Sequence, residues 1–99
     1  MYKSRFENQD IDDLFTAILK LENQEECYRF FEDLCTIKEI QDMAQRLKVA
    51  KLLQNKISYQ EIGKETKAST ATISRVNKSL IYGAEGYHLI MKKLKEDEE

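Results

Sequence analysis

The stretch SYQEIGKETKASTATISRV, residues 58–76, contains two short amphipathic segments with almost nothing between them. Ser58 is followed three residues later by Glu61, which is a capping-box pattern that opens the first segment. Ser69 or Thr70 can cap the second segment. The second segment is crowded with hydroxyl side chains, which are poor choices for a helix that only fills a core. The stretch therefore predicts a helix, a tight turn and a second helix whose hydroxyl side chains contact a polar partner.

Apolar residues recur at helical spacing on both sides of this stretch. They predict helices over 11–19, from 23 to about 35, from 36 to about 55, over 58–66, from 69 to about 82, and over 85–95. Thr36 with Glu39 is a further capping box, and Gly83 is expected to end the fifth helix in the left-handed conformation. The chain has no Pro and only three Gly, which also favours an all-α fold. We expect the acidic tail KEDEE to be frayed.

Ninety-nine residues form a single domain, and six helices in so short a chain leave each helix short. The N-terminal helices carry more large apolar groups than one small domain needs. A homodimer that shares its core would cover them. We therefore assign residues 11–55 to dimerisation, 58–82 to a helix-turn-helix and 84–95 to a C-terminal helix.

Composition excludes several classes of function. Cys27 and Cys35 are about 12 Å apart along one helical face, too far for a disulfide, so we expect buried free thiols. A single His and the absence of a C-x-x-C pattern argue against a metal site. There is no Gly-rich loop and no nucleophile–base set, so we expect no enzyme and no cofactor. No apolar run approaches the roughly 20 residues of a membrane span, and the N-terminus lacks a signal-peptide core, which predicts a cytoplasmic protein.

Charge is distributed unevenly along the chain, although the net charge is only −2. Residues 1–35 hold four basic and nine acidic side chains, a net charge of −5. Residues 36–80 hold nine basic and four acidic ones, a net charge of +5. A local positive field of this kind is what phosphate binding needs.

The layout of residues 58–82 is that of a DNA-reading helix-turn-helix. Ile62 and Ile73 are expected to point inward and hold the two helices together, with small Gly63 where they cross. Ser69 caps the second helix and leaves its N-terminal amide groups free for phosphate. The hydroxyls and the methyl group at the exposed start of that helix suit base edges. These reading residues are Thr70, Ala71 and Ser74, and the charged residues Lys64, Arg75 and Lys78 support them.

The chain resembles the Trp repressor family, and within it the TrpR-related YerC/YecD group. The resemblance covers about residues 30–83 and is carried by LCTIKEI, LLQNKIS and ATISRVNKSL. It implies an all-helical, intertwined homodimer with two reading heads that bind double-stranded DNA. By this resemblance, the DNA contacts fall at Gln60, Gly63, Thr70, Ala71, Thr72 and Ser74. The corepressor position of the family falls at Arg75, Ser79 and either Arg46 or Gln45, depending on one alignment gap.

Two residues depart from the family pattern. Val76 stands where the family has a glycine beside which the indole of tryptophan packs. A branched side chain there fills that space, so we expect either no corepressor or a smaller one. Lys67 stands at the turn position where glycine is usual, and a left-handed conformation there would cost on the order of 1 kcal/mol.

The leading interpretation is a DNA-binding transcriptional regulator, specifically a repressor. A second interpretation is a replication or chromosome protein that uses the same helical head. A third is a helical dimer that binds only proteins. Binding to DNA separates the first two from the third, and the position of the bound sites separates the first from the second.

Overall fold

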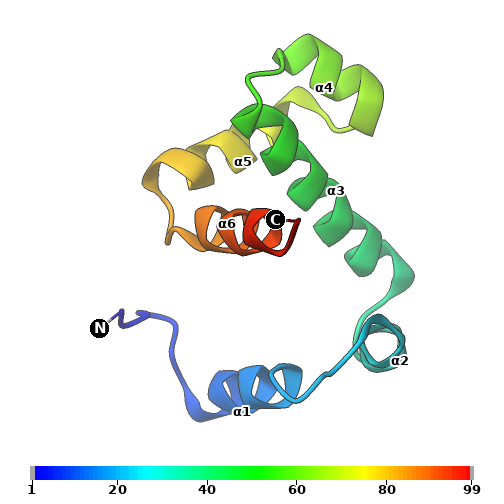
Figure 1. Ribbon diagram of the computed structural model, residues 1–99, viewed down its shortest axis with the longest axis vertical. Helices are drawn as coiled ribbons and strands as arrows, with labels where there is room; N and C mark the ends of the chain where they lie inside the picture. The colour runs from blue at the N-terminus through cyan, green and yellow to red at the C-terminus, as the bar shows by residue number, and fades with distance from the viewer. Residues whose placement is uncertain (1, 99) are drawn as a thin grey trace. The chain divides into compact units, whose positions relative to one another are not determined.

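The computed structural model describes residues 2–98, which form six α-helices joined by short connections (Figure 1). The bounds are α1 Gln9–Ile18, α2 Gln24–Leu34, α3 Ile37–Gln54, α4 Tyr59–Thr66, α5 Thr70–Tyr82 and α6 Gly86–Glu98. The predicted all-α architecture is confirmed, and most of the helix ends lie within one or two residues of the expected positions. None of these helices is long and apolar enough to cross a membrane.

Side-chain caps fix the start of four helices, and two of them, at Ser58 and Ser69, were expected from the sequence. In each, the oxygen of an Asn or Ser side chain accepts the backbone N–H of the residue three positions further on. The four pairs are Asn8 with Ile11 at 2.9 Å, Asn23 with Glu26 at 2.9 Å, Ser58 with Glu61 at 3.2 Å and Ser69 with Thr72 at 3.1 Å. These local bonds satisfy N–H groups that have no partner inside the helix.

The chain divides into two units, residues 1–36 and residues 37–99. In the second unit, α3 packs against α4, α5 and α6, and α4 packs against α5. Figure 1 shows α4 and α5 gathered around the C-terminal half of the long helix α3. Between these helices lies a closed apolar core. Its buried members are Val49, Ala50, Ile62, Ala68, Ile73 and Val76.

The first unit has no comparable core of its own. Neither α1 nor α2 contains a buried residue. Large apolar side chains remain in solvent, with Leu19 84% and Phe15 56% exposed. The prediction of buried thiols is wrong for the single chain, because Cys27 is exposed and Cys35 is only half-buried, both as free cysteines. The apolar faces that the sequence places on these helices are therefore at most half-covered within the unit.

Two expectations about helix ends are wrong. Gly83 ends α5 with φ −83°, not in the left-handed conformation. Glycine is nevertheless needed there, because an added Cβ would lie 2.4 Å from the backbone oxygen of Ser79. The left-handed residue of this junction is Glu85, with φ 67°. Residues 95–98 of the acidic tail are not frayed either, since α6 continues through Glu98, and Glu99 lies outside the described residues.

Candidate nucleic-acid interface

The predicted helix-turn-helix is formed by α4, the turn 67–69 and α5. Ile62 of α4 and Ile73 of α5 are 0% and 1% exposed, which confirms that they hold the two helices on the core. Ala68 in the turn is also buried, at 8% exposure, and was not singled out from the sequence. A small apolar residue in the turn lets it close over Ile62 and Ile73. The pair of helices is thus supported from beneath by packed side chains.

Polar contacts fix the end of α4. The hydroxyl of Thr66 donates to the backbone oxygen of Ile62 at 2.7 Å and accepts the N–H of Ala68 at 3.1 Å. The side-chain amide of Gln45, on α3, donates to the backbone oxygen of Thr66 at 3.0 Å. The role of Gln45 could not be expected from the sequence, because a polar residue on a helix gives no sign of a partner 21 positions away. These bonds hold the turn in one place relative to α3.

Lys67 occupies the turn in the left-handed conformation, with φ 64° and ψ 11°. Its backbone N–H donates to the oxygen of Gly63 at 3.0 Å and so satisfies a carbonyl at the end of α4. The expected role of Gly63 in a tight helix crossing is not supported. A Cβ added there would meet the oxygen of Ala68 at 3.6 Å and Cδ1 of Ile73 at 4.0 Å, which are ordinary contacts.

Most of the residues predicted to contact DNA lie on the surface of this unit. Gly63 and Thr72 are half-buried. Thr72 also takes part in the cap, since its hydroxyl accepts a hydrogen bond from the hydroxyl of Ser69 at 3.1 Å. The remaining predicted contacts are exposed, namely Gln60, Lys64, Thr70, Ala71, Ser74, Arg75 and Lys78. The start of α5 thus presents two hydroxyls and a methyl group to solvent.

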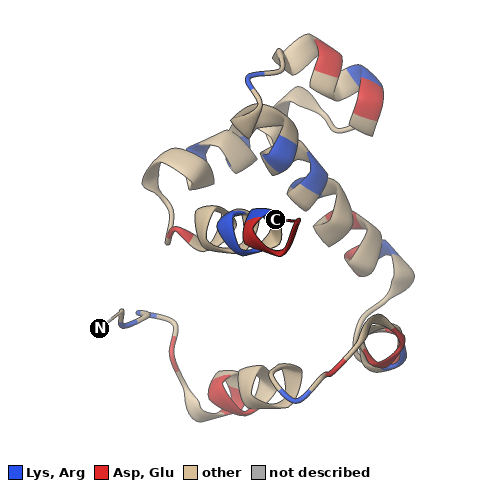
Figure 2. Cartoon of the chain, viewed as in Figure 1, with Lys and Arg blue, Asp and Glu red and all other residues tan. Residues whose placement is uncertain are grey.

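Basic side chains surround this surface. Figure 2 shows Lys and Arg on the C-terminal half of α3, on α4 and on α5, while acidic residues lie on α4, at Glu61 and Glu65, and on the last turns of α6. The ion pair on α3 lies at its other end, between Lys38 and Asp42 at 3.1 Å. Lys64 and Lys78 have no salt bridge within residues 2–98, so their charges remain available to an anion.

A separate cavity of about 370 Å³ lies between α3, α5 and α6. Its lining residues are Arg46, Arg75, Val76, Ser79 and Tyr87. Arg46, and not Gln45, therefore shares the cavity with Arg75 and Ser79, since Gln45 turns toward α4. Val76 is only 2% exposed and belongs to the core. Tyr87 of α6 was not among the residues expected to hold a ligand.

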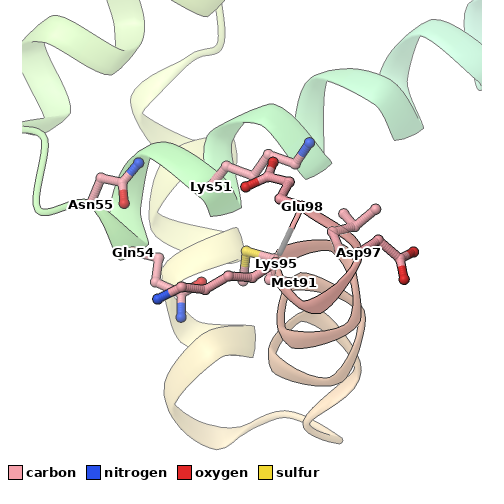
Figure 3. A pocket seen from close by; sticks show the side chains of 8 residues that line it. Lys51, Gln54, Asn55, Met91, Lys95, Asp97 and Glu98 are labelled. Atoms are coloured by element: carbon pink, nitrogen blue, oxygen red, sulfur yellow. The ribbon is translucent and has the colours of Figure 1, made fainter.

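Another hollow, of about 600 Å³, lies between the C-terminal end of α3 and α6. Figure 3 shows its lining, with Lys51 and Gln54 from α3 and Met91, Lys95 and Glu98 from α6. Charges of both signs line it, and none of the residues predicted to bind DNA or a ligand does. This hollow therefore adds nothing to the candidate interface.

The geometry defines a class of protein: an all-α protein with a helix-turn-helix whose second helix exposes its N-terminal face. Residues 9–95 match the family model described as Trp repressor protein. The chain belongs to this family, as the resemblance in its sequence predicts.

A related sequence and two solved structures are similar to this chain over nearly its whole length. The chain is 50% identical over 98 residues to the uncharacterized protein YerC of Bacillus subtilis (strain 168), covering 99% of this chain and 94% of YerC. The fold is similar to a TrpR-like protein from Eubacterium eligens, with a TM-score of 0.89, 48% identity and coverage of 92% and 94% of the two chains. A proposed Trp repressor from Staphylococcus aureus matches with a TM-score of 0.88 and 49% identity over 92% and 91% of the chains.

Proposed function

We propose that this protein is a sequence-specific DNA-binding transcriptional regulator that acts as a homodimer and represses its target genes. The observation that carries the proposal is the helix-turn-helix itself. Ile62 and Ile73 fix α4 and α5 on a closed core, while the hydroxyl-rich start of α5 stays exposed. Family membership supports the same class of function. A repressor acts by occupying its site, which needs no further domain.

The homodimer rests on the exposed apolar faces of the N-terminal helices. Side chains such as Phe15, Leu19 and Leu34 are half or more exposed in the single chain. A second copy that covers them would remove several large apolar groups from water, at about 1.5–3 kcal/mol for each fully buried side chain. A two-fold dimer also presents two reading heads, which suits a site with two half-sites one helical turn apart.

We assign two kinds of DNA contact. Lys64 and Lys78 contact phosphates and position the protein, because their charges are exposed and unpaired within the described residues. Thr70, Ala71 and Ser74 face base edges, because they lie at the exposed start of α5. Gln60 and Arg75 are exposed beside them and supply further hydrogen bonds.

The two kinds of contact give different signatures in a binding experiment. Replacing Lys64 or Lys78 by Ala should weaken binding to every duplex and lower the salt dependence by about one counterion per head. Replacing Thr70 or Ser74 by Ala should instead change the preference among selected sequences, by about 1–3 kcal/mol for each lost base contact. Lys92→Ala on α6 is the matched control and should leave both quantities unchanged. If all four interface variants bound as the unmutated chain does, the reading head would lie elsewhere.

We further propose that tryptophan is not a corepressor of this protein. Val76 is packed into the core and lines the cavity that Arg46, Arg75 and Ser79 share. A ligand ring would have to displace it, and overfilling a packed site costs about 1–3 kcal/mol. Titration calorimetry with L-tryptophan should therefore detect no binding. Tight binding by the unmutated chain would contradict the proposal, and binding by a folded Val76→Gly variant alone would support it.

A replication or chromosome protein with the same head is the alternative function, because the geometry of α4 and α5 suits either role. Genome-wide mapping of bound sites separates them. Sites at promoters support the regulator, and sites clustered at a replication origin support the alternative. A helical dimer that binds only proteins would show no enriched DNA sites.

A further inference from the structure

Within the described residues, three that are not glycine adopt the left-handed conformation: Lys56, Lys67 and Glu85, with φ of 63°, 64° and 67°. Each stands in a connection between two helices. The left-handed conformation is unfavourable for a residue that carries a Cβ, whereas glycine adopts it freely. A charged residue at each of these positions therefore makes the turn less stable than glycine would.

Lys67 makes no visible contribution to the fold through its side chain. The contact that ends α4 comes from its backbone N–H, which donates to Gly63 at 3.0 Å and which glycine would provide equally well. The side chain is exposed and has neither an ion pair nor a hydrogen bond within residues 2–98. The fold thus accepts a strained backbone without using the ammonium group.

The position of Lys67 indicates what the ammonium group meets. It follows α4 directly and precedes Ser69, the cap of α5, by two residues. When a helix-turn-helix docks, its first helix crosses the DNA backbone and the start of its second helix enters the major groove. The turn between them then lies at the edge of the groove, where the phosphates are, and a lysine ammonium is a compact point charge suited to a phosphate.

We propose that Lys67 of each reading head binds a DNA backbone phosphate, and that this contact is retained although it lowers the stability of the fold. The proposal rests on the proposed DNA-binding function. It gives a role in DNA binding to Lys67, which stands at a turn position where the family usually has glycine. Its consequence is that stability and DNA affinity change in opposite directions when Lys67 becomes glycine.

The test uses the full chain and a duplex of about 30 base pairs of arbitrary sequence, long enough for two half-sites. Fluorescence anisotropy at several salt concentrations gives the affinity and its salt slope, and circular dichroism at one protein concentration gives the Tm. Lys67→Gly removes both the strain and the charge, whereas Lys67→Gln removes only the charge. Lys56→Gly is the matched control, because it makes the same substitution in the same conformation outside the α4–α5 turn.

For Lys67→Gly we expect the Tm to rise by about 2–5 °C and the salt slope to fall by about one per head. Affinity should fall by about threefold to tenfold per head near 0.1 M salt. Lys67→Gln should show the same fall in slope without the rise in Tm. Lys56→Gly should show the rise in Tm with an unchanged slope.

An unchanged salt slope in Lys67→Gln would overturn this proposal and leave the DNA-binding function standing. Absence of duplex binding by the unmutated chain would overturn both. If Lys67→Gly did not fold, the slope of Lys67→Gln would still decide the matter, because that variant keeps a Cβ and therefore the backbone requirement of the original residue.

Discussion

The two units of the chain differ in how completely they bury their apolar side chains. From Ile37 onward, four helices bury a core that includes Val49, Ile62 and Ile73, each at 0–1% exposure. Before it, α1 and α2 bury nothing completely. The same kind of amphipathic pattern therefore produces a closed core in one unit and exposed apolar faces in the other. The difference teaches that amphipathicity predicts a buried face without saying which chain will cover it.

Charge separates the two units as well. Residues 1–36 have a net charge of −5, and residues 37–99 have a net charge of +3. An acidic region repels a phosphate backbone, which agrees with the proposed DNA surface on the second unit. The first unit combines exposed apolar faces with an acidic surface, which suits association with protein. Four experiments test this contrast.

The largest effect is expected from a charge on the apolar face of α1. Phe15→Glu should abolish the dimer, because a carboxylate would have to be buried against the second copy. Analytical ultracentrifugation at micromolar concentration should give about twice the monomer mass for the unmutated chain and the monomer mass for this variant. Thr16→Glu, at an exposed polar position about 100° from Phe15 around α1, is the control and should remain dimeric. A monomeric unmutated chain would remove the two-headed arrangement.

A truncation in the closed core should have the next largest effect. Ile73→Ala removes a side chain that is 1% exposed and should lower the free energy of unfolding by about 2–5 kcal/mol, measured by urea denaturation. Ile18→Ala makes the same change at a half-buried position of α1 and should act mainly on the monomer–dimer equilibrium. If Ile18→Ala left the dimer intact and destabilised the chain as much as Ile73→Ala, the contrast between the units would fail.

Loss of the hydrogen bond between Gln45 and Thr66 should have a smaller and local effect on stability. Gln45→Ala removes the hydrogen bond to the backbone oxygen of Thr66 and should destabilise the chain by about 1 kcal/mol. Hydrogen exchange should quicken in α4 more than in α6. Gln54→Ala, at an exposed position near the end of the same helix, is the comparison variant. Equal exchange rates in α4 for both variants would show that Gln45 does not hold the turn.

The smallest effect, and of opposite sign, is expected at Gly63. Alanine fits there without a close contact, and it suits a helix better than glycine, so Gly63→Ala should stabilise the chain by about 0.5–1 kcal/mol. Gly83→Ala should destabilise it, because its Cβ would lie 2.4 Å from a backbone oxygen. Thermal unfolding of the two variants at equal concentration compares them. A lower Tm for Gly63→Ala would restore the tight-crossing interpretation.

Local chemistry explains why so much of the fold was predictable. The caps at Ser58 and Ser69 act within three residues, so the sequence alone indicated where those helices start. Ile62 and Ile73 followed from helical spacing. Gly83 was misjudged because a left-handed end and a close backbone approach both favour glycine, and only the coordinates distinguish them.

The sequence by itself determined the helix count, the helix-turn-helix, the charge asymmetry and the family, because these depend on spacing and on bonds between near neighbours. Only the tertiary structure decided which polar side chains are partners and which residues share a cavity. It turned Gln45 toward Thr66 and placed Arg46 with Arg75 and Ser79, a choice that one alignment gap had left open. Adjacent residues on a helix point about 100° apart. The packing of α3 against its neighbours, and not its sequence, therefore determines whether Gln45 or Arg46 points into the cavity.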